Sequence, residues 1–144
     1  MIAPLASNGA AVLGVDPAAR PMVRDGCVRG RAGMAKRVLI VEDDPLIAFD
    51  LQAIVEDAGH EVVSVCASRR DGLAELGRGI DFALLDVDLT DGKSFPVAQA
   101  LRAQCIPFVF VSGSLRSELP AELGAVPFIA KPYAEAAIVR ALPA

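Results

Sequence analysis

The chain has 144 residues, of which 53% are hydrophobic and 22% are charged. This composition excludes a disordered chain and is sufficient for one globular domain with a buried core. The formal net charge of −4 argues against the basic surface that direct nucleic-acid binding requires. No stretch approaches the roughly 20 apolar residues that cross a bilayer, so we expect no membrane segment and a cytoplasmic protein.

Residues 1–35 differ in composition from the rest of the chain. They are rich in Ala, Gly, Pro and Arg and show no sustained hydrophobic period. We predict a flexible N-terminal extension over 1–35, of which residues 1–33 are absent from the natural product if translation begins at Met34. No basic stretch precedes its apolar residues, so we expect neither a signal peptide nor an anchor. The pattern becomes regular at Lys36, and we predict one folded domain over 36–144.

The first two elements of this domain are a buried strand and an amphipathic helix. The run RVLIV over 37–41 is almost wholly apolar, as expected of a strand covered on both faces. Asp44 is placed to cap the helix that follows, and Pro45 suits its first turn. Apolar residues then recur at helical spacing until Gly59 ends the helix.

The remaining elements continue this alternation. In order, we predict a strand over 61–66, a helix from Ser68 to about Gly77 with Ser68 and Asp71 in capping-box spacing, a strand over 81–86, a helix marked by Val97, Ala98 and Leu101, strands over 107–111 and 126–130, and a helix over 134–142. Strands that alternate with helices predict an α/β fold with a parallel sheet and helices on both faces.

Polar side chains follow the strands at the edge where open parallel sheets bind ligands. They are Glu42, Asp43 and Asp44 after the first strand, Asp86 and Asp88 after the third, Ser112 and Gly113 after the fourth, and Lys131 and Pro132 after the fifth. Carboxylates gathered there resist ionising together unless a cation neutralises them, and oxygen ligands suit Mg²⁺. Asp86 is then placed to attack a phosphoryl group, while Lys131 and Ser112 share the charge of its oxygens.

Four segments together resemble a known family. VLIVEDD, LLDVDLTDG, VFVSG and KPY occur in the order and spacing of the receiver domain of two-component response regulators, and the likeness covers about residues 36–142. The resemblance implies a flavodoxin-like, doubly wound sheet of five parallel strands in the order 2-1-3-4-5. It also implies a phosphoprotein that carries an aspartyl phosphate in phosphorelay signal transduction.

The resemblance also implies a role for each matching residue. Asp86 is the phosphoacceptor. Glu42 and Asp43 are the acidic pair, with Asp43 a direct ligand of Mg²⁺, and Asp88 offers the metal its backbone carbonyl. Ser112 is the hydroxyl that moves toward the phosphate, Lys131 is the family's lysine and is joined to Pro132 by a cis peptide, and Phe128 is the aromatic switch residue. We expect self-catalysed phosphotransfer and slow autodephosphorylation, and no enzyme activity beyond these.

The chain departs from the family pattern between the fourth and fifth strands. Lys131 follows Ser112 by only 19 positions, and Pro120 interrupts the segment between them, so we predict a short or irregular fourth helix. Phe110 to Gly113 resembles the Phe-Ala-Thr-Gly-type tetrad of a subgroup of stand-alone receivers that are paired with kinases of the HWE class. We therefore expect a stand-alone receiver. Its partner would be such a sensor histidine kinase or a phosphotransfer protein, and its downstream target stays open.

Two alternatives compete with this interpretation. LLDVDLT fits the D-x-D-x-T signature of haloacid-dehalogenase-like phosphatases, with Asp86 as nucleophile and Asp88 as acid/base. The metal-binding acids of that superfamily follow the lysine, however, and Glu135 is the only acid after Lys131. A binding module that works without phosphorylation is disfavoured because every position of the acceptor site is filled.

Overall fold

The computed structural model describes residues 35–144. The predictions for the N-terminal extension, including its flexibility and a start at Met34, concern residues that lie outside this part of the chain, apart from Ala35. The main sheet has five parallel strands: β1 (Arg37–Val41), β2 (Glu61–Cys66), β3 (Phe82–Leu85), β6 (Phe108–Ser112) and β7 (Phe128–Ala130). Their order is β2-β1-β3-β6-β7, which confirms the predicted order 2-1-3-4-5.

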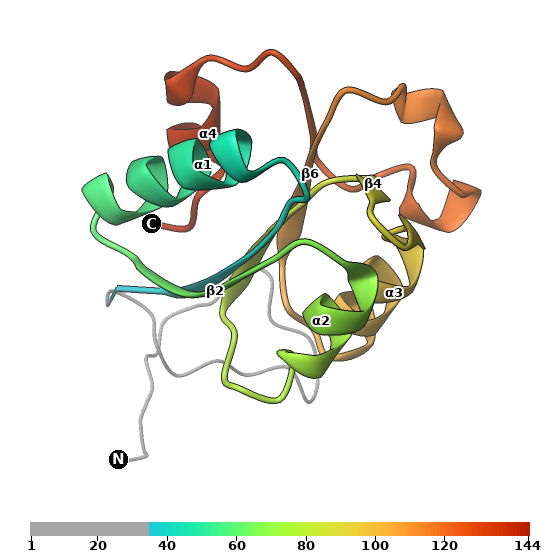
Figure 1. Cartoon of the computed structure of the whole chain (residues 1–144), viewed down its shortest axis with the longest axis horizontal. Helices are drawn as coiled ribbons and strands as arrows, with labels where there is room; N and C mark the ends of the chain where they lie inside the picture. Colours follow the sequence, from blue (N-terminus) through green and yellow to red (C-terminus); the bar gives the residue numbers. More distant parts are fainter. Residues whose placement is uncertain (1–34) are drawn as a thin grey trace. The chain divides into compact units, whose positions relative to one another are not determined.

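Two helices cover each face of this sheet (Figure 1). Helices α1 (Pro45–Asp57) and α4 (Glu135–Ala141) lie on one face, and α2 (Arg69–Ala74) and α3 (Phe95–Ala103) on the other. The alternation of side chains along β1 divides the core: Val38 and Ile40 pack with α1 and α4, whereas Leu39 and Val41 pack with α3. Because both faces are covered, the central strands are apolar throughout.

Helix α1 begins as its sequence predicts. The Oδ1 of Asp44 accepts hydrogen bonds from the backbone N–H groups of Leu46, at 2.9 Å, and Ile47, at 3.4 Å. Pro45 occupies the first turn, where no N–H is required. Farther along the helix, the Tyr133 hydroxyl donates to Oδ2 of Asp50 at 2.7 Å, which ties the connection before α4 to α1.

Helix α2 is shorter than predicted. Ser68 caps it by accepting from the N–H of Asp71 at 3.0 Å, but the helix ends at Ala74 rather than near Gly77. Beyond that point the backbone bonds span three residues, as in Leu76 N–H to Leu73 O at 3.3 Å. The last predicted turn is therefore a series of tight turns that a helical hydrophobic period does not distinguish from helix.

The segment between β6 and β7 contains two short 3₁₀ helices, η2 (Arg116–Glu118) and η3 (Ala121–Leu123). Pro120 separates them, so the predicted short or irregular fourth helix is confirmed. Strand β7 starts at Phe128 and not at Val126, because the N–H of Val126 closes η3 on Leu123 O at 3.1 Å and Pro127 has no N–H.

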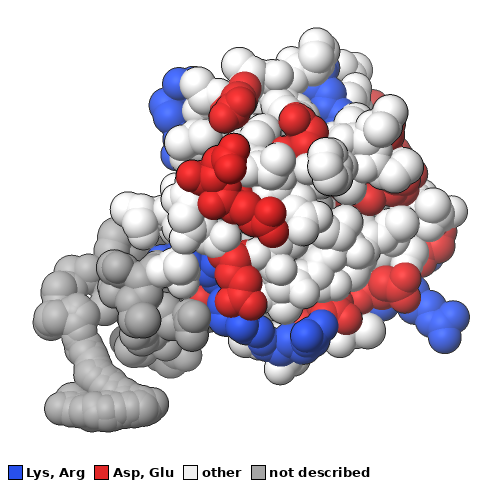
Figure 2. Space-filling view, turned by 60° about the vertical axis from the view of Figure 1, so that its left-hand side comes forward, with Lys and Arg blue, Asp and Glu red and all other residues white. Residues whose placement is uncertain are grey.

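A small antiparallel hairpin after β3 was not predicted. Strands β4 (Asp88–Leu89) and β5 (Gly92–Lys93) pair across the turn at Thr90 and Asp91. Gly92, the first residue of β5, has a φ of +126°, a value that favours glycine. Figure 2 brings forward the side of Figure 1 where α1 and α4 lie, and it shows acidic side chains in several groups across that face. Among residues 35–144, every helix is too short or too polar to cross a membrane.

Candidate functional site

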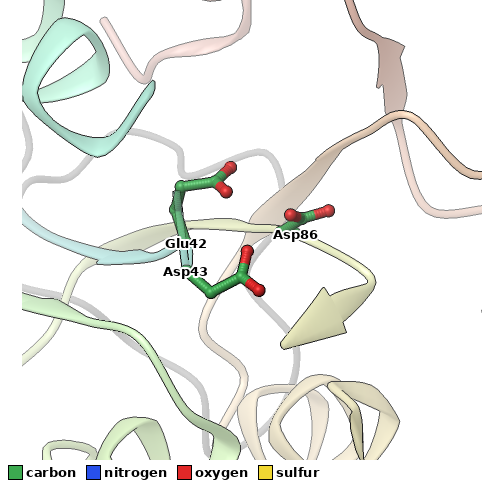
Figure 3. A group of neighbouring side chains, drawn as sticks. All are labelled: Glu42, Asp43 and Asp86. Carbon is green, nitrogen blue, oxygen red and sulfur yellow. The ribbon is translucent and has the colours of Figure 1, made fainter. Parts of the chain in front are cut away.

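Three carboxylates meet at the carboxyl ends of the two central strands. Glu42 and Asp43 follow β1, and Asp86 follows β3. The register pairs Val41 with Leu85, so the first residue after each strand reaches the same edge of the sheet. One carboxylate oxygen of each acid lies within 4.8 Å of those of the other two, and Figure 3 shows the three side chains gathered there. This group has the geometry and the hard oxygen donors to hold a divalent cation.

Burial makes the negative charge of this group costly. Glu42 is 3% exposed and Asp86 is 7% exposed. Burial raises the pKa of Glu42 to about 7, against the opposing hydrogen bonds from Lys131 and from the N–H of Asp44, and the charge of Asp86 adds to the rise. A carboxyl that is buried beside a second carboxylate ionises readily only when a cation is close to it.

Lys131 is the cation of this site. Its Nζ lies 2.7 Å from Oε1 of Glu42 and 3.1 Å from Oδ2 of Asp86. Burial opposes its charge, but the hydrogen bonds to these two carboxylates outweigh that effect and raise the pKa of Lys131. The peptide bond to Pro132 is cis, as the resemblance implied. The ammonium group of Lys131 thus contacts two of the three carboxylates, those of Glu42 and Asp86.

The Asp86 carboxylate is held by a different group at each oxygen. Its Oδ1 accepts from the N–H of Val87 at 2.7 Å, and its Oδ2 accepts from Lys131. Its own N–H donates to Val41 O at 2.9 Å. The side chain is thus oriented by the backbone of the strand end and by one ammonium group, which is the preorganisation that a nucleophile needs.

Ser112 and Phe128 belong to the neighbouring strands. Ser112 ends β6 and is 1% exposed, and its Oγ accepts from the N–H of Ser114 at 3.1 Å. Phe128 begins β7, and its ring packs 6.3 Å from that of Phe110 under the guanidinium of Arg116, which is 5.6 Å away. The structure therefore places Ser112 at the rim and Phe128 in an aromatic cluster within the sheet.

The Asp88 side chain has partners outside the carboxylate group. Its Oδ1 accepts from Lys93 Nζ at 2.5 Å, and its Oδ2 accepts from the Ser114 hydroxyl. The hydrogen bond from Lys93, and then the one from Ser114, lower the pKa of Asp88. Sequence reasoning missed Lys93 and Ser114. The Asp91–Gly92 pair signals the turn that returns Lys93 to Asp88, but the contact with Ser114 has no local signal.

The whole domain matches one family model. The model for the response regulator receiver domain matches residues 38–143, a range that contains every residue of the site. The chain belongs to the response regulator receiver domain family. The sheet order is therefore that of a receiver domain, as the resemblance implied.

Several relatives of this receiver domain are known. The phyllosphere-induced regulator PhyR of Methylorubrum extorquens is 35% identical over 124 residues, which are 83% of this chain and 43% of PhyR. The transcriptional regulatory protein PdtaR of Mycobacterium tuberculosis is 26% identical over 117 residues, which are 77% of this chain and 57% of PdtaR. The chain thus spans about half the length of these curated relatives.

Solved structures show the same fold. SdrG from Sphingomonas melonis Fr1 is 38% identical with a TM-score of 0.66, over 74% of this chain and 92% of SdrG. The receiver domain of PhyR from Erythrobacter litoralis has a TM-score of 0.69 at 23% identity, over 76% of this chain and 88% of that domain. Membership of the receiver family, and an Asp88 carboxylate already bound by Lys93 and Ser114, disfavour the phosphatase alternative.

Proposed function

We propose that this receiver domain accepts a phosphoryl group on Asp86 from a sensor histidine kinase or a phosphotransfer protein in the cytoplasm. The observation that carries the proposal is the position of Asp86, an oriented carboxylate beside two further acids and one lysine. A kinase of the HWE class is the finer proposal, and it rests on the likeness of Phe110–Gly113 to the tetrad of the stand-alone subgroup.

The transfer uses groups that the chain already positions. A carboxylate oxygen of Asp86 attacks phosphorus, the bond from phosphorus to the donor histidine nitrogen breaks, and that nitrogen keeps the bonding pair. The Lys131 ammonium and the Ser112 hydroxyl stabilise the negative charge on the transferred oxygens. Mg²⁺ would neutralise the charge of the phosphoryl oxygens. The residues that would hold it are the acidic pair, Glu42 and Asp43, together with Asp86 and the backbone carbonyl of Asp88.

The product changes the charge of the site and so provides a signal. The acyl phosphate replaces one negative charge with about two. Lys131 and Ser112, which lie at the same edge of the sheet as Asp86, would reorient toward it. Phe128, three residues before Lys131, would change rotamer with them and alter the surface around η2, η3 and α4 for a protein target. The domain would act as a phosphoacceptor with slow self-hydrolysis and not as a turnover enzyme.

Intact mass spectrometry after incubation with acetyl phosphate and Mg²⁺ tests this function. We expect a mass gain of one phosphoryl group that requires the metal ion and is absent from Asp86→Ala. Asp57→Ala is the matched control, because Asp57 is an exposed acid at the end of α1, and it should be phosphorylated like the wild type. Rapid release of inorganic phosphate with no mass gain would instead support a phosphatase.

A further inference from the structure

The hairpin after β3 and the segment after β6 are joined by exposed charged side chains. Lys93 Nζ contacts Oδ1 of Asp88 at 2.5 Å and lies 3.6 Å from Oε1 of Glu118. The other oxygen of Asp88 accepts from the Ser114 hydroxyl, and Oε2 of Glu118 accepts from the N–H of Leu115 at 3.2 Å. Lys93 thus links two points of the segment after β6 to one hairpin.

This linkage reaches the hydroxyl of Ser112. The N–H of Ser114 donates to Ser112 Oγ at 3.1 Å, and the same residue donates its own hydroxyl to Asp88. A serine hydroxyl both donates and accepts. Because its oxygen already accepts from Ser114, a fixed Ser114 restrains the direction in which the Ser112 proton points. The position of Ser114 therefore influences how Ser112 meets a phosphoryl group on Asp86.

The charges of the pair favour the same arrangement. The Lys93 ammonium lies between the carboxylates of Asp88 and Glu118, two groups of opposite charge to its own. The Asp88 carboxylate accepts from both Lys93 and Ser114. Removal of the Lys93 ammonium would take away the cation that contacts both Asp88 and Glu118, and the two carboxylates would then repel each other.

The hairpin is a fixed platform for Lys93. The carboxylate of Asp91 accepts from the N–H groups of Arg69, at 2.8 Å, and Arg70, at 3.1 Å, at the start of α2. The Thr90 hydroxyl donates to Ala67 O at 3.1 Å. These bonds anchor the turn to the β2–α2 connection. Lys93 therefore extends from an anchored hairpin to Glu118 in the segment after β6.

We propose that Lys93 is a positioning residue for the reaction at Asp86. It holds Asp88 and Glu118 together and, through Ser114, keeps the Ser112 hydroxyl directed toward the phosphoryl oxygens. This inference rests on the proposed phosphoacceptor function and adds to it a residue outside the carboxylate group that sets the rate of transfer.

The first test compares phosphorylation rates with acetyl phosphate at saturating Mg²⁺ and low ionic strength. Lys93→Met should be phosphorylated more slowly, by about 1.4- to fivefold, the range expected for an exposed ion pair, and Lys93→Arg should recover most of the wild-type rate. Arg78→Met is the matched control because it breaks the Arg78–Glu75 pair, also on the surface. The ratio of wild-type to Lys93→Met rates should approach one in roughly 1 M NaCl, which screens exposed pairs.

The second test needs no phosphorylation. Amide hydrogen exchange at Ser114, followed by NMR, should be faster in Lys93→Met than in the wild type and in Arg78→Met. A Lys93→Met protein with the wild-type phosphorylation rate at low salt, or with unchanged exchange at Ser114, would overturn the inference. If the wild type takes up no phosphate, the proposed function fails, and the Ser114 amide still shows whether Lys93 orders this segment.

Discussion

The carboxylate group and the segment after β6 are held in different ways. Glu42 and Asp86 follow strands β1 and β3, which are buried except for Arg37 at the start of β1, and they are bound by backbone N–H groups and a half-buried lysine. The segment over 113–127 is mostly exposed, and side-chain contacts such as Arg116 Nη1 to Gly124 O at 2.6 Å hold its 3₁₀ turns. The proposed phosphoacceptor thus lies on the more buried part of the fold, and the proposed signalling surface lies on a more exposed part, which we expect to open more easily.

The largest contrast should appear when the same substitution is made in both regions. Leu39 in β1 is 0% exposed, whereas Leu115 is 66% exposed. Leu39→Ala should lower the free energy of unfolding by about 2–5 kcal/mol, because it removes buried apolar surface and leaves a cavity. Leu115→Ala should change it by less than about 0.5 kcal/mol. Urea unfolding measures both values, and equal losses would mean that the segment is packed as firmly as the strands.

Removal of the lysine ammonium should affect the chemistry more than the fold. Lys131→Met takes away the partner of Glu42 and Asp86 and the cation nearest the transferred oxygens. The rate of phosphorylation by acetyl phosphate should fall by about 10²-fold, as is typical when one charge-stabilising donor is lost. Arg140→Met, an exposed change in the last turn of α4, is the control. A Lys131→Met rate within a fewfold of the wild type would remove Lys131 from the reaction.

The raised pKa of Glu42, to about 7, predicts a pH dependence of stability in the absence of metal ions. The folded state binds a proton that the unfolded state has already lost between about pH 4.5 and 7, so this contribution to stability falls as pH rises. Relative to Glu42→Gln, the wild type should therefore lose about 1–3 kcal/mol of unfolding free energy between pH 5 and pH 7. Urea unfolding in EDTA measures it.

Mg²⁺ provides the control for this pH effect. A cation binds the ionised carboxylates, so the stabilisation by Mg²⁺ should be larger at pH 7 than at pH 5. A pH-independent difference between wild type and Glu42→Gln would show that Glu42 titrates in the fold as it does in the unfolded chain.

The carboxylate region was predictable because its signals are local. Apolar runs such as 37–41 and 82–85 identify buried strands, and the parallel topology brings the acids that follow them to one edge. The hairpin escaped prediction because strands of two residues show no period. The contacts of Lys93 and Ser114 were also missed, because Ser114 lies 26 positions from Asp88 in the chain and only the folded geometry joins them.

The smallest predicted effect concerns how the segment after β6 is held. Arg116 stacks on Phe128 and donates to Gly124 O, and a cation–π contact at an exposed site stabilises by about 0.5–1 kcal/mol. Arg116→Met keeps the aliphatic stem and should therefore lower the global unfolding free energy by less than about 1 kcal/mol. Hydrogen exchange of the amides over 116–124 should nevertheless become faster, while exchange in β1 and β3 stays unchanged. Faster exchange in β1 and β3 as well would mean that the segment and the strands unfold as one unit, and that the site and the segment are not separately stable.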